Sequence, residues 1–126
     1  MKVAIVGSRG YPRLDLVTKY VQGLPRDTVI VSGGAPGVDE CAAAAASLFG
    51  LQVIEFIPEW DKYKPADPRK KNPAGMIRNT EIIKEADRVV AFHSAASKGT
   101  ANSIMKARKA GKPVIVFDAQ GNEVKP

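Results

Sequence analysis

The sequence predicts an α/β fold with a central parallel sheet of about five strands, covered by helices on both faces. Over 126 residues, short apolar runs rich in β-branched residues alternate with segments of helical length. Parallel neighbours in a sheet need a crossover connection, and a helix supplies it. No linker or repeat interrupts the alternation, so we expect residues 1–126 to form a single domain.

The first half of the chain contains three predicted strands and two predicted helices. Residues 3–6 (VAIV), 29–31 and 53–57 are short, largely apolar runs, which are typical of strands buried on both faces. Between the first two, residues 14–24 carry leucine or valine at helical spacing. Alanine dominates residues 38–49, and its small side chain lets a helix lie close to the sheet.

The second half continues the alternation after an irregular segment. Residues 58–73 contain four prolines and five basic residues, so we expect a long surface loop. Residues 76–86 and 101–110 have the length and pattern of helices. The apolar runs 89–92 and 114–117 complete the sheet, and we expect them also to be fully buried.

Charge and cysteine content narrow the classes of partner and compartment. The chain has 19 Lys and Arg against 13 Asp and Glu, a net charge of +6, which favours phosphate-bearing partners or serves solubility alone. Cys41 is the single cysteine and is expected to be buried, so no internal disulfide can form. No signal peptide or run of 18 apolar residues appears, and we expect a cytoplasmic protein that does not associate with membranes.

Three glycine- and serine-rich segments follow predicted strands. They are residues 7–10 (GSRG), 32–37 (SGGAPG) and 93–100 (HSAASKGT). Ligands of open α/β sheets bind beyond the carboxyl ends of the strands, and each segment leads into a helix N-terminus, which attracts anions. The three loops together predict a phosphate-binding site. Neither GxxxxGK[ST] nor GxGxxG is present, which disfavours a Walker ATPase and an ordinary dinucleotide dehydrogenase.

Six segments in a fixed order carry the features of a known family. They read GSRG, SGGAPGVDECA, PEW, AGMIRNTEII, ADRVVAF and SKGTANSI, and they extend to about residue 117. In this order they resemble the SLOG superfamily, in particular its small stand-alone branch related to YspA and YpsA. The resemblance implies a Rossmann-like three-layer fold with a nucleotide-binding pocket. The superfamily includes the lonely-guy phosphoribohydrolases, the single-strand DNA-binding DprA proteins, and sensor domains for nucleotide signals derived from NAD.

The lonely-guy enzymes have two motifs, MxxRK and PGGxGTxxE, against which this chain can be compared. Residues 76–79 (MIRN) resemble the arginine segment, and residues 99–100 match the GT pair. Ser103 stands at the position of the catalytic glutamate, and residues 95–96 (AA) replace the proline and glycine. Glycoside cleavage needs a carboxylate that stabilises the developing positive charge on ribose and activates water, and serine cannot do this.

A hydrolase would therefore need another acid. Asp39, Glu40 and Glu81 lie near these motifs, and we take Asp39 and Glu81 as the catalytic candidates. Asp39 has an equally good structural role as an acid in the first turn of a helix, where it interacts favourably with the helix dipole. The catalytic residues stay unassigned.

Three side chains stand out as ligand candidates. Arg9 can pair with phosphate through its planar fork, or be a solvated loop residue. Arg78 lies in the family motif and is our first choice as an anion ligand. Trp60 suits stacking on a base, or else a cap on the core or a dimer contact. The predicted ligand- and phosphate-binding set is Gly7, Ser8, Arg9, Gly33, Gly34, Ala35, Gly37, Asp39, Trp60, Arg78, Asn79, Ser97, Gly99 and Thr100.

Two further features have weaker functional interpretations. His93 is the sole histidine and has no cysteine or histidine partner, so we predict no metal site and no cofactor. Residues 69–71 (RKK) either contact nucleic acid or form an ordinary solvated surface.

The sequence leaves three functions open. The first is a domain that senses or sequesters a nucleotide or an NAD- or ADP-ribose-type ligand. The second is a nucleotide N-glycoside hydrolase, and the third is a DprA-like single-stranded DNA-binding protein. The segment SGGAPGVDECAAAAA and the positive charge favour the third, but Trp60, Tyr11 and Tyr63 are few aromatics for a stacking platform. We expect a homodimer or higher homo-oligomer, with only weak nucleic-acid binding.

Overall fold

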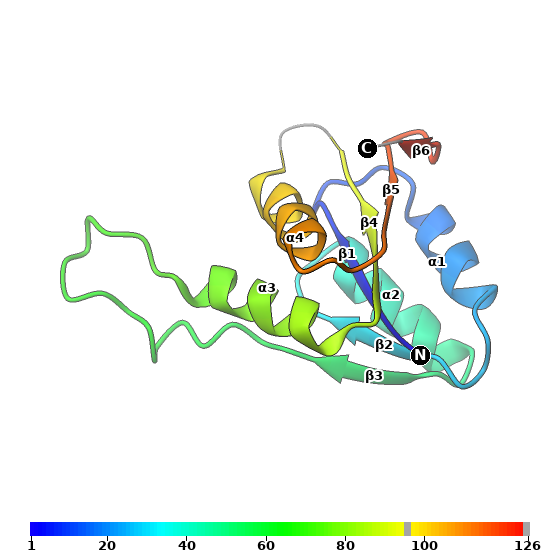
Figure 1. Cartoon of the computed structure of the whole chain (residues 1–126), viewed down its shortest axis with the longest axis horizontal. Helices are drawn as coiled ribbons and strands as arrows, with labels where there is room; N and C mark the ends of the chain where they lie inside the picture. Colours follow the sequence, from blue (N-terminus) through cyan, green and yellow to red (C-terminus); the bar gives the residue numbers. More distant parts are fainter. Residues whose placement is uncertain (95–96, 125–126) are drawn as a thin grey trace.

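A computed structural model of the chain describes residues 1–94 and 97–124 (Figure 1). The elements, in order, are β1 (Lys2–Gly7), α1 (Leu14–Gln22), β2 (Val29–Ser32), α2 (Val38–Leu48), β3 (Gln52–Glu55), α3 (Ala74–Glu85), β4 (Arg88–Phe92), α4 (Lys98–Lys109), β5 (Val114–Phe117) and β6 (Glu123–Val124). The predicted alternation of strands and helices is confirmed.

The strands form one sheet in the order β3-β2-β1-β4-β5-β6. The first five pair in parallel, as the sequence predicts, and β6 adds an antiparallel edge that the sequence analysis did not foresee. In the centre of the sheet, Gly7 at the end of β1 pairs with Phe92 at the end of β4. The loops that follow these two strands therefore begin side by side.

Helices cover both faces of the sheet, which makes the predicted three layers (Figure 1). On one face α1 and α2 pack over a core that includes Val17, Val38 and Phe92. On the other face α3 and α4 pack over a second core that includes Ile82 and Ile104. This is a Rossmann-like architecture.

Two strands are less buried than their apolar sequences predict. β1, β2 and β4 have buried centres, but every residue of β3 is half-buried or exposed, and in β5 only Val116 is buried. Because β3 is an edge strand, it lacks a neighbour on one side. The predicted strand 53–57 also ends early, at Glu55, and Ile57 beyond it is 60% exposed. The expectation of five fully buried strands is therefore wrong for β3 and β5.

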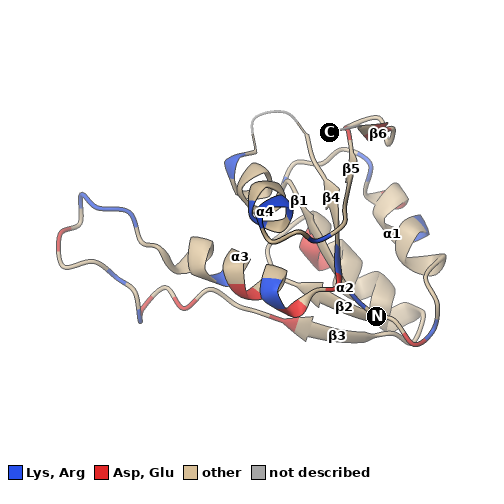
Figure 2. Ribbon diagram, viewed as in Figure 1, with Lys and Arg blue, Asp and Glu red and all other residues tan. Residues whose placement is uncertain are grey.

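The segment between β3 and α3 extends away from the sheet and returns into α3 (Figure 1). It contains no helix or strand from residue 56 to residue 73, in agreement with the predicted surface loop. We call residues 56–73 the arm. Lysine and arginine residues, including the exposed run 69–71, are spread along it together with aspartate and glutamate residues (Figure 2).

Two helices begin earlier than predicted. α4 starts at Lys98 because the Ser97 side chain caps it by accepting a hydrogen bond from the Thr100 amide. α3 starts at Ala74, directly after Pro73. None of the helices in the described part of the chain is long and apolar enough to cross a membrane.

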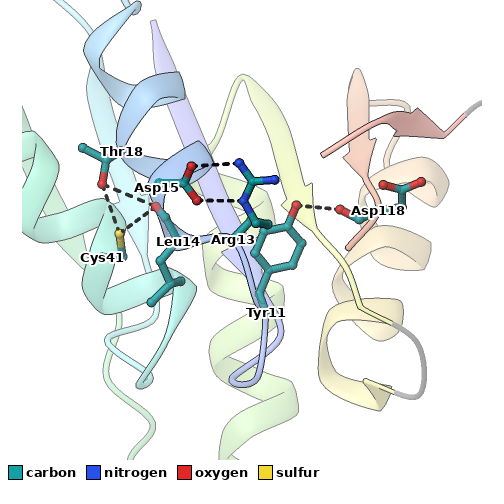
Figure 3. Close-up of polar contacts among 7 residues, drawn as sticks. All are labelled: Tyr11, Arg13, Leu14, Asp15, Thr18, Cys41 and Asp118. Atoms are coloured by element: carbon teal, nitrogen blue, oxygen red, sulfur yellow. Dashed lines mark hydrogen bonds and ion pairs between the residues drawn. The ribbon is translucent and has the colours of Figure 1, made fainter. Parts of the chain in front are cut away.

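Cys41 belongs to α2, and its side chain contacts α1 at the margin of the core rather than in its interior. Its thiol is 3.4 Å from the Thr18 hydroxyl and 3.4 Å from the Leu14 carbonyl oxygen (Figure 3). The side chain is half-buried, so the expectation of a buried cysteine holds only in part.

Candidate functional site

A cavity of about 510 Å³ opens at the carboxyl ends of the central strands. The chain runs outward through β2 and β3 on one side of β1, and through β4 and β5 on the other. The strand order therefore reverses between β1 and β4, and ligands of open α/β sheets bind at such a point. Residues from the loops after β1, β2 and β4 and from α3 and α4 line the cavity.

The loops after β1 and β4 are fastened to each other. The Ser8 amide donates to the Phe92 carbonyl oxygen at 3.1 Å, and the Ser94 amide donates to the Ser8 hydroxyl oxygen at 3.1 Å. Ser8 is buried, with 4% of its surface exposed. This serine joins two walls of the cavity and has a structural role in addition to any contact with a ligand.

The loop that carries Arg9 is anchored from its far end. Tyr11 is buried, its ring packs edge-on against Phe92, and its hydroxyl donates to the Asp118 carbonyl oxygen at 2.5 Å (Figure 3). Arg13 pairs with Asp15 through two contacts of 3.0 Å at the start of α1. Arg9 itself is exposed and lines the cavity. Since Tyr11 is buried, its ring is not available for base stacking.

The N-terminus of α4 forms another wall. The Ser97 hydroxyl caps the helix and lies 2.9 Å from the Thr100 hydroxyl, and both residues line the cavity together with Gly99. Thr100 is 4% exposed. A helix N-terminus presents backbone N–H groups and the positive end of the helix dipole, both of which favour an anion.

Arg78 enters the cavity from α3. Its Nη1 donates to the Gly33 carbonyl oxygen at 2.5 Å and its Nε to Asn79 Oδ1 at 3.1 Å. Asn79 in turn contacts Asn102 of α4 at 3.4 Å. Burial lowers the pKa of the Arg78 guanidinium, which still carries its charge in the folded protein. The fork is held in place and keeps donors for an anionic ligand.

Asp39 lies in the first turn of α2 and is buried, with 7% of its surface exposed. Its Oδ2 accepts a hydrogen bond from the Ala35 amide at 3.3 Å. Burial raises the pKa of this carboxyl to about 6, against the smaller lowering effects of the Ala35 amide and Arg78. The residue predicted either as a helix-dipole acid or as a catalytic candidate is thus a titratable group near neutral pH in the cavity wall.

Two glycines make this arrangement possible. A methyl group at Gly33 would lie 2.7 Å from Arg78 Nη1 and 3.0 Å from Asp39 Oδ2, so a side chain there would displace Arg78. Gly37 has a φ of +90° and would bring a methyl group within 2.6 Å of the Arg9 carbonyl oxygen. The loop after β2 can therefore pack closely against the loop after β1 only with glycine at this position.

The cavity brings together ten of the fourteen residues predicted as ligands. Those that line it are Gly7, Ser8, Arg9, Ala35, Asp39, Arg78, Asn79, Ser97, Gly99 and Thr100. Gly33 and Gly37 do not line it but pack against Arg78 and Arg9, respectively, whereas Gly34 is exposed and close to Ile57. Trp60 lies outside the cavity on the arm, 50% exposed and near Gly75 of α3.

Sequence reasoning did not include five lining residues in the ligand set. They are Val6, Gly10, Ile82, Ser94 and Ser103. Ile82 lies four residues after Arg78 on α3, so the helical period places it on the same face. The other four adjoin or continue motifs already recognised, and this proximity was the available signal.

The three acidic residues considered for catalysis differ in whether they line the cavity. Asp39 lines the cavity, whereas Glu40 and Glu81 are exposed and do not. Ser103, at the position of the family glutamate, lines the cavity and is 3% exposed. Residues 95–96, which replace the family's proline and glycine, lie outside the described residues.

The fold and the cavity define a Rossmann-like α/β protein with a glycine- and serine-lined site at the point where the strand order reverses. The model of the SLOG cluster4 family (LDcluster4) matches residues 1–125, and the chain belongs to this family. It is also similar to the Gene 61 protein of Mycobacterium phage D29. The two are 33% identical over 121 residues, which cover 92% of this chain and 95% of the phage protein.

Solved structures share this architecture. DNA processing protein A (DprA) from Streptococcus pneumoniae is 27% identical with a TM-score of 0.76, and the match covers 92% of this chain. The chain spans 50% of the length of that DprA. The protein TM1055 has a TM-score of 0.61 at 24% identity, over 90% of this chain and 71% of its own.

The DprA from Helicobacter pylori, whose structure describes a single-stranded DNA binding mode, has a TM-score of 0.60 at 23% identity. That match covers 93% of this chain and 65% of the H. pylori protein. At 24% and 23% identity, the similarities to TM1055 and to the H. pylori DprA show a shared fold and nothing further.

Proposed function

We propose that this chain binds a nucleotide or an NAD- or ADP-ribose-type ligand in the cavity, as a sensor or sequestering protein. The observation that carries the proposal is that two arginines, Arg9 and Arg78, and the N-terminus of α4 line one cavity at the switch point of the sheet. The site thus combines charged and backbone donors for phosphate. Membership of the SLOG cluster4 family supports this assignment.

The size and chemistry of the cavity agree with a ligand of this class. Its volume of about 510 Å³ lies within the range of small-molecule sites. Val6 and Ile82 contribute apolar surface, and serine and threonine hydroxyls contribute polar contacts. A nucleotide has both an apolar base and polar sugar and phosphate groups.

A thermal-unfolding series with matched ligands tests this proposal. Adenosine, AMP, NAD and ADP-ribose are compared, because adenosine is the control that lacks phosphate. A ligand at about 100 times its dissociation constant stabilises the folded state by about 2.7 kcal/mol, which raises the melting temperature by several degrees. We expect this for at least one of the phosphate-bearing ligands and not for adenosine. Equal effects of adenosine and the nucleotides would argue against a phosphate site.

Hydrolysis of the ligand is not part of the proposal, because Ser103 stands at the position of the catalytic glutamate of the lonely-guy enzymes. We predict that nucleoside monophosphates incubated with the protein release no free base above the buffer control, measured by chromatography. Ser103→Glu is the matched variant, and low turnover there would indicate a pocket otherwise like that of the lonely-guy enzymes. Rapid base release by the natural sequence would contradict a binding-only function.

Single-stranded DNA binding is the second candidate function. The similarity to the S. pneumoniae DprA, the net charge of +6 and the exposed basic run 69–71 on the arm favour it (Figure 2). Aromatic side chains for base stacking are few, which argues against a major role. Trp60 is exposed on the arm, but Tyr11 is buried. Contacts of this surface would be made mainly with the phosphate backbone.

We predict weak DNA binding that disappears near physiological salt. Each neutralised phosphate contributes about −0.7 to the log–log salt slope for single strands, so four contacts lower the affinity roughly 50-fold between about 50 and 200 mM salt. Nucleotide binding inside the cavity should change far less. Fluorescence anisotropy with Lys70→Glu/Lys71→Glu separates the two, because the variant should lose only the DNA signal. Submicromolar oligonucleotide binding near 150 mM salt that the variant loses would make DNA the principal ligand.

A further inference from the structure

Asp39 is the one acidic residue among the described residues that line the cavity. It shares the cavity with Arg9, Arg78 and the N-terminus of α4, the groups suited to an anion. A bound phosphate therefore has to lie in the same cavity as a buried carboxyl group. Unless something neutralises that carboxyl group, the two like charges repel each other.

The groups around Asp39 compensate the negative charge of its carboxylate only in part. A side chain at Gly33 would meet both Arg78 Nη1 and Asp39 Oδ2, so these two groups lie close to each other. Oδ2 accepts a hydrogen bond from the Ala35 amide, and the Gly33 amide also favours the charged form, but the buried Oδ1 has no hydrogen-bond partner among the described residues. None of the ion pairs found in the described part of the chain includes Asp39. Arg78 is close enough to act on the carboxyl group electrostatically without pairing with it directly.

An anion that enters beside Arg78 shifts the protonation equilibrium of Asp39 towards the neutral acid. It uses donors of the guanidinium, so that less of the positive field reaches Asp39, and it adds negative charge in a partly buried environment. Both effects favour the neutral carboxylic acid. The neutral acid also gains an O–H donor, which can bond to a phosphate oxygen where a carboxylate would repel it.

We propose that anion binding in this cavity is coupled to protonation of Asp39, which takes up a proton from solvent when a phosphate group binds beside Arg78. The coupling rests on the proposed nucleotide function for its biological ligand, but it applies to any anion at Arg78. Asp39 then makes the affinity of the site depend on pH.

Burial of Asp39, set against the groups around it, places this proton uptake near neutral pH. Burial raises the pKa of Asp39 to about 6, the Ala35 amide, Arg78 of α3 and the Gly33 amide lower it, and Glu55 of β3 raises it. Arg9 acts on Arg78 from the loop after β1. Since the starting pKa is about 6, a modest further rise on binding makes the free protein mostly ionised and the complex mostly protonated at about pH 7.

The expected result is a loss of affinity as the pH rises. Between the pKa of Asp39 in the free protein and its pKa in the complex, the dissociation constant increases by up to about tenfold per pH unit. ADP-ribose is a suitable probe because each of its bridging phosphates keeps one charge over this range. A monophosphate is unsuitable because its second ionisation, near pH 6, overlaps that of Asp39.

Isothermal titration calorimetry measures the proton uptake directly. ADP-ribose is titrated at about pH 7 in buffers of different ionisation enthalpy, and we expect an uptake of more than about half a proton per ligand. Asp39→Asn should abolish this uptake. Glu40→Gln, which alters an exposed acid in the same turn of α2, should preserve it. Uptake that is absent in the natural sequence, or unchanged in Asp39→Asn, would overturn the proposal.

A second measurement separates this coupling from the identity of the ligand. Inorganic sulfate is the probe, because it stays a dianion throughout the titration of Asp39. Carbon-detected NMR follows the Asp39 carboxyl group against pH, in sulfate and in sodium chloride of equal ionic strength. A higher midpoint in sulfate would support the coupling even if ADP-ribose fails to bind, and in that case only the nucleotide function would fail. An identical midpoint in the two salts would refute the coupling.

Discussion

Asp39→Asn is expected to stabilise the ligand-free protein increasingly as the pH rises, by about 3 kcal/mol more at about pH 8 than at about pH 3.5. The reason is the buried carboxyl group, whose pKa in the folded state is about 6. In the unfolded chain the group titrates near its ordinary value of about 3.9. Between these two values the folded state binds more protons than the unfolded state, so the natural protein loses stability as the pH rises through the window.

Asparagine removes this dependence because it stays neutral. Its amide oxygen can still accept the hydrogen bond that Oδ2 of Asp39 accepts from the Ala35 amide. Urea unfolding at a series of pH values measures the effect, and the difference between variant and natural protein should grow from about pH 4 to about pH 6 and then stay constant. Glu40→Gln serves as the control, since Glu40 is exposed in the same turn. A constant difference across the whole range would mean that Asp39 is not destabilised by its burial.

The cost of burying a carboxylate raises the question of why an acid occupies position 39. A buried, incompletely paired carboxylate lowers stability, and an asparagine or alanine would avoid that cost. Destabilising groups of this kind are concentrated at functional sites. The location of Asp39 in the wall of the cavity is consistent with a role in binding.

Much of the fold could be predicted because its signals are local. The apolar runs that become β1, β2 and β4 are short and continuous, and the intervening segments have the length of helices. The exposure of β3 could not be predicted from its own residues, since the strand order places it at an edge of the sheet and the sequence does not contain that order directly. β6 has only two residues, Glu123–Val124, too few to produce a pattern.

The candidate site likewise has features that could be predicted from the sequence and features that could not. The glycine- and serine-rich loops are local features, and they do meet at one edge of the sheet as expected. The environment of Asp39 is not local, because Arg78 of α3, which acts on its carboxyl group, comes from a distant part of the chain and is held at the Gly33 carbonyl oxygen. Trp60 has an aromatic character that is evident in the sequence, but its distance from the cavity follows from the path of the arm. The position of a residue relative to a strand end therefore predicts better than side-chain chemistry alone whether it lines the cavity.

Arg78→Ala should weaken binding of a phosphate-bearing ligand by about 10- to 150-fold. Hydrogen bonds that involve a charged group contribute about 1.5–3 kcal/mol, and the fork of Arg78 is already held by Gly33 and Asn79 before a ligand arrives. The substitution also removes the charged donor to the Gly33 carbonyl oxygen, which should lower the free energy of unfolding by about 1.5–3 kcal/mol. The fold should therefore persist while the affinity falls.

Calorimetry with ADP-ribose measures the loss of affinity, and Arg69→Ala is the matched control. Arg69 lies on the arm, exposed and paired with Asp67, so its removal should leave the affinity within about twofold. Arg78→Lys keeps a positive charge but loses the planar fork, and we expect an intermediate affinity. If Arg78→Ala binds as tightly as the natural protein, the phosphate does not lie beside α3.

The same substitution connects Arg78 to Asp39. Arg78 is one of the groups that lower the pKa of Asp39, so its removal should raise that pKa above about 6 in the ligand-free protein. NMR titration of the Asp39 carboxyl group should therefore show a higher midpoint in Arg78→Ala, and an unchanged midpoint in Arg69→Ala. An unchanged midpoint in both variants would mean that the two side chains are not coupled, and that the loss of affinity in Arg78→Ala arises from the missing phosphate contact alone.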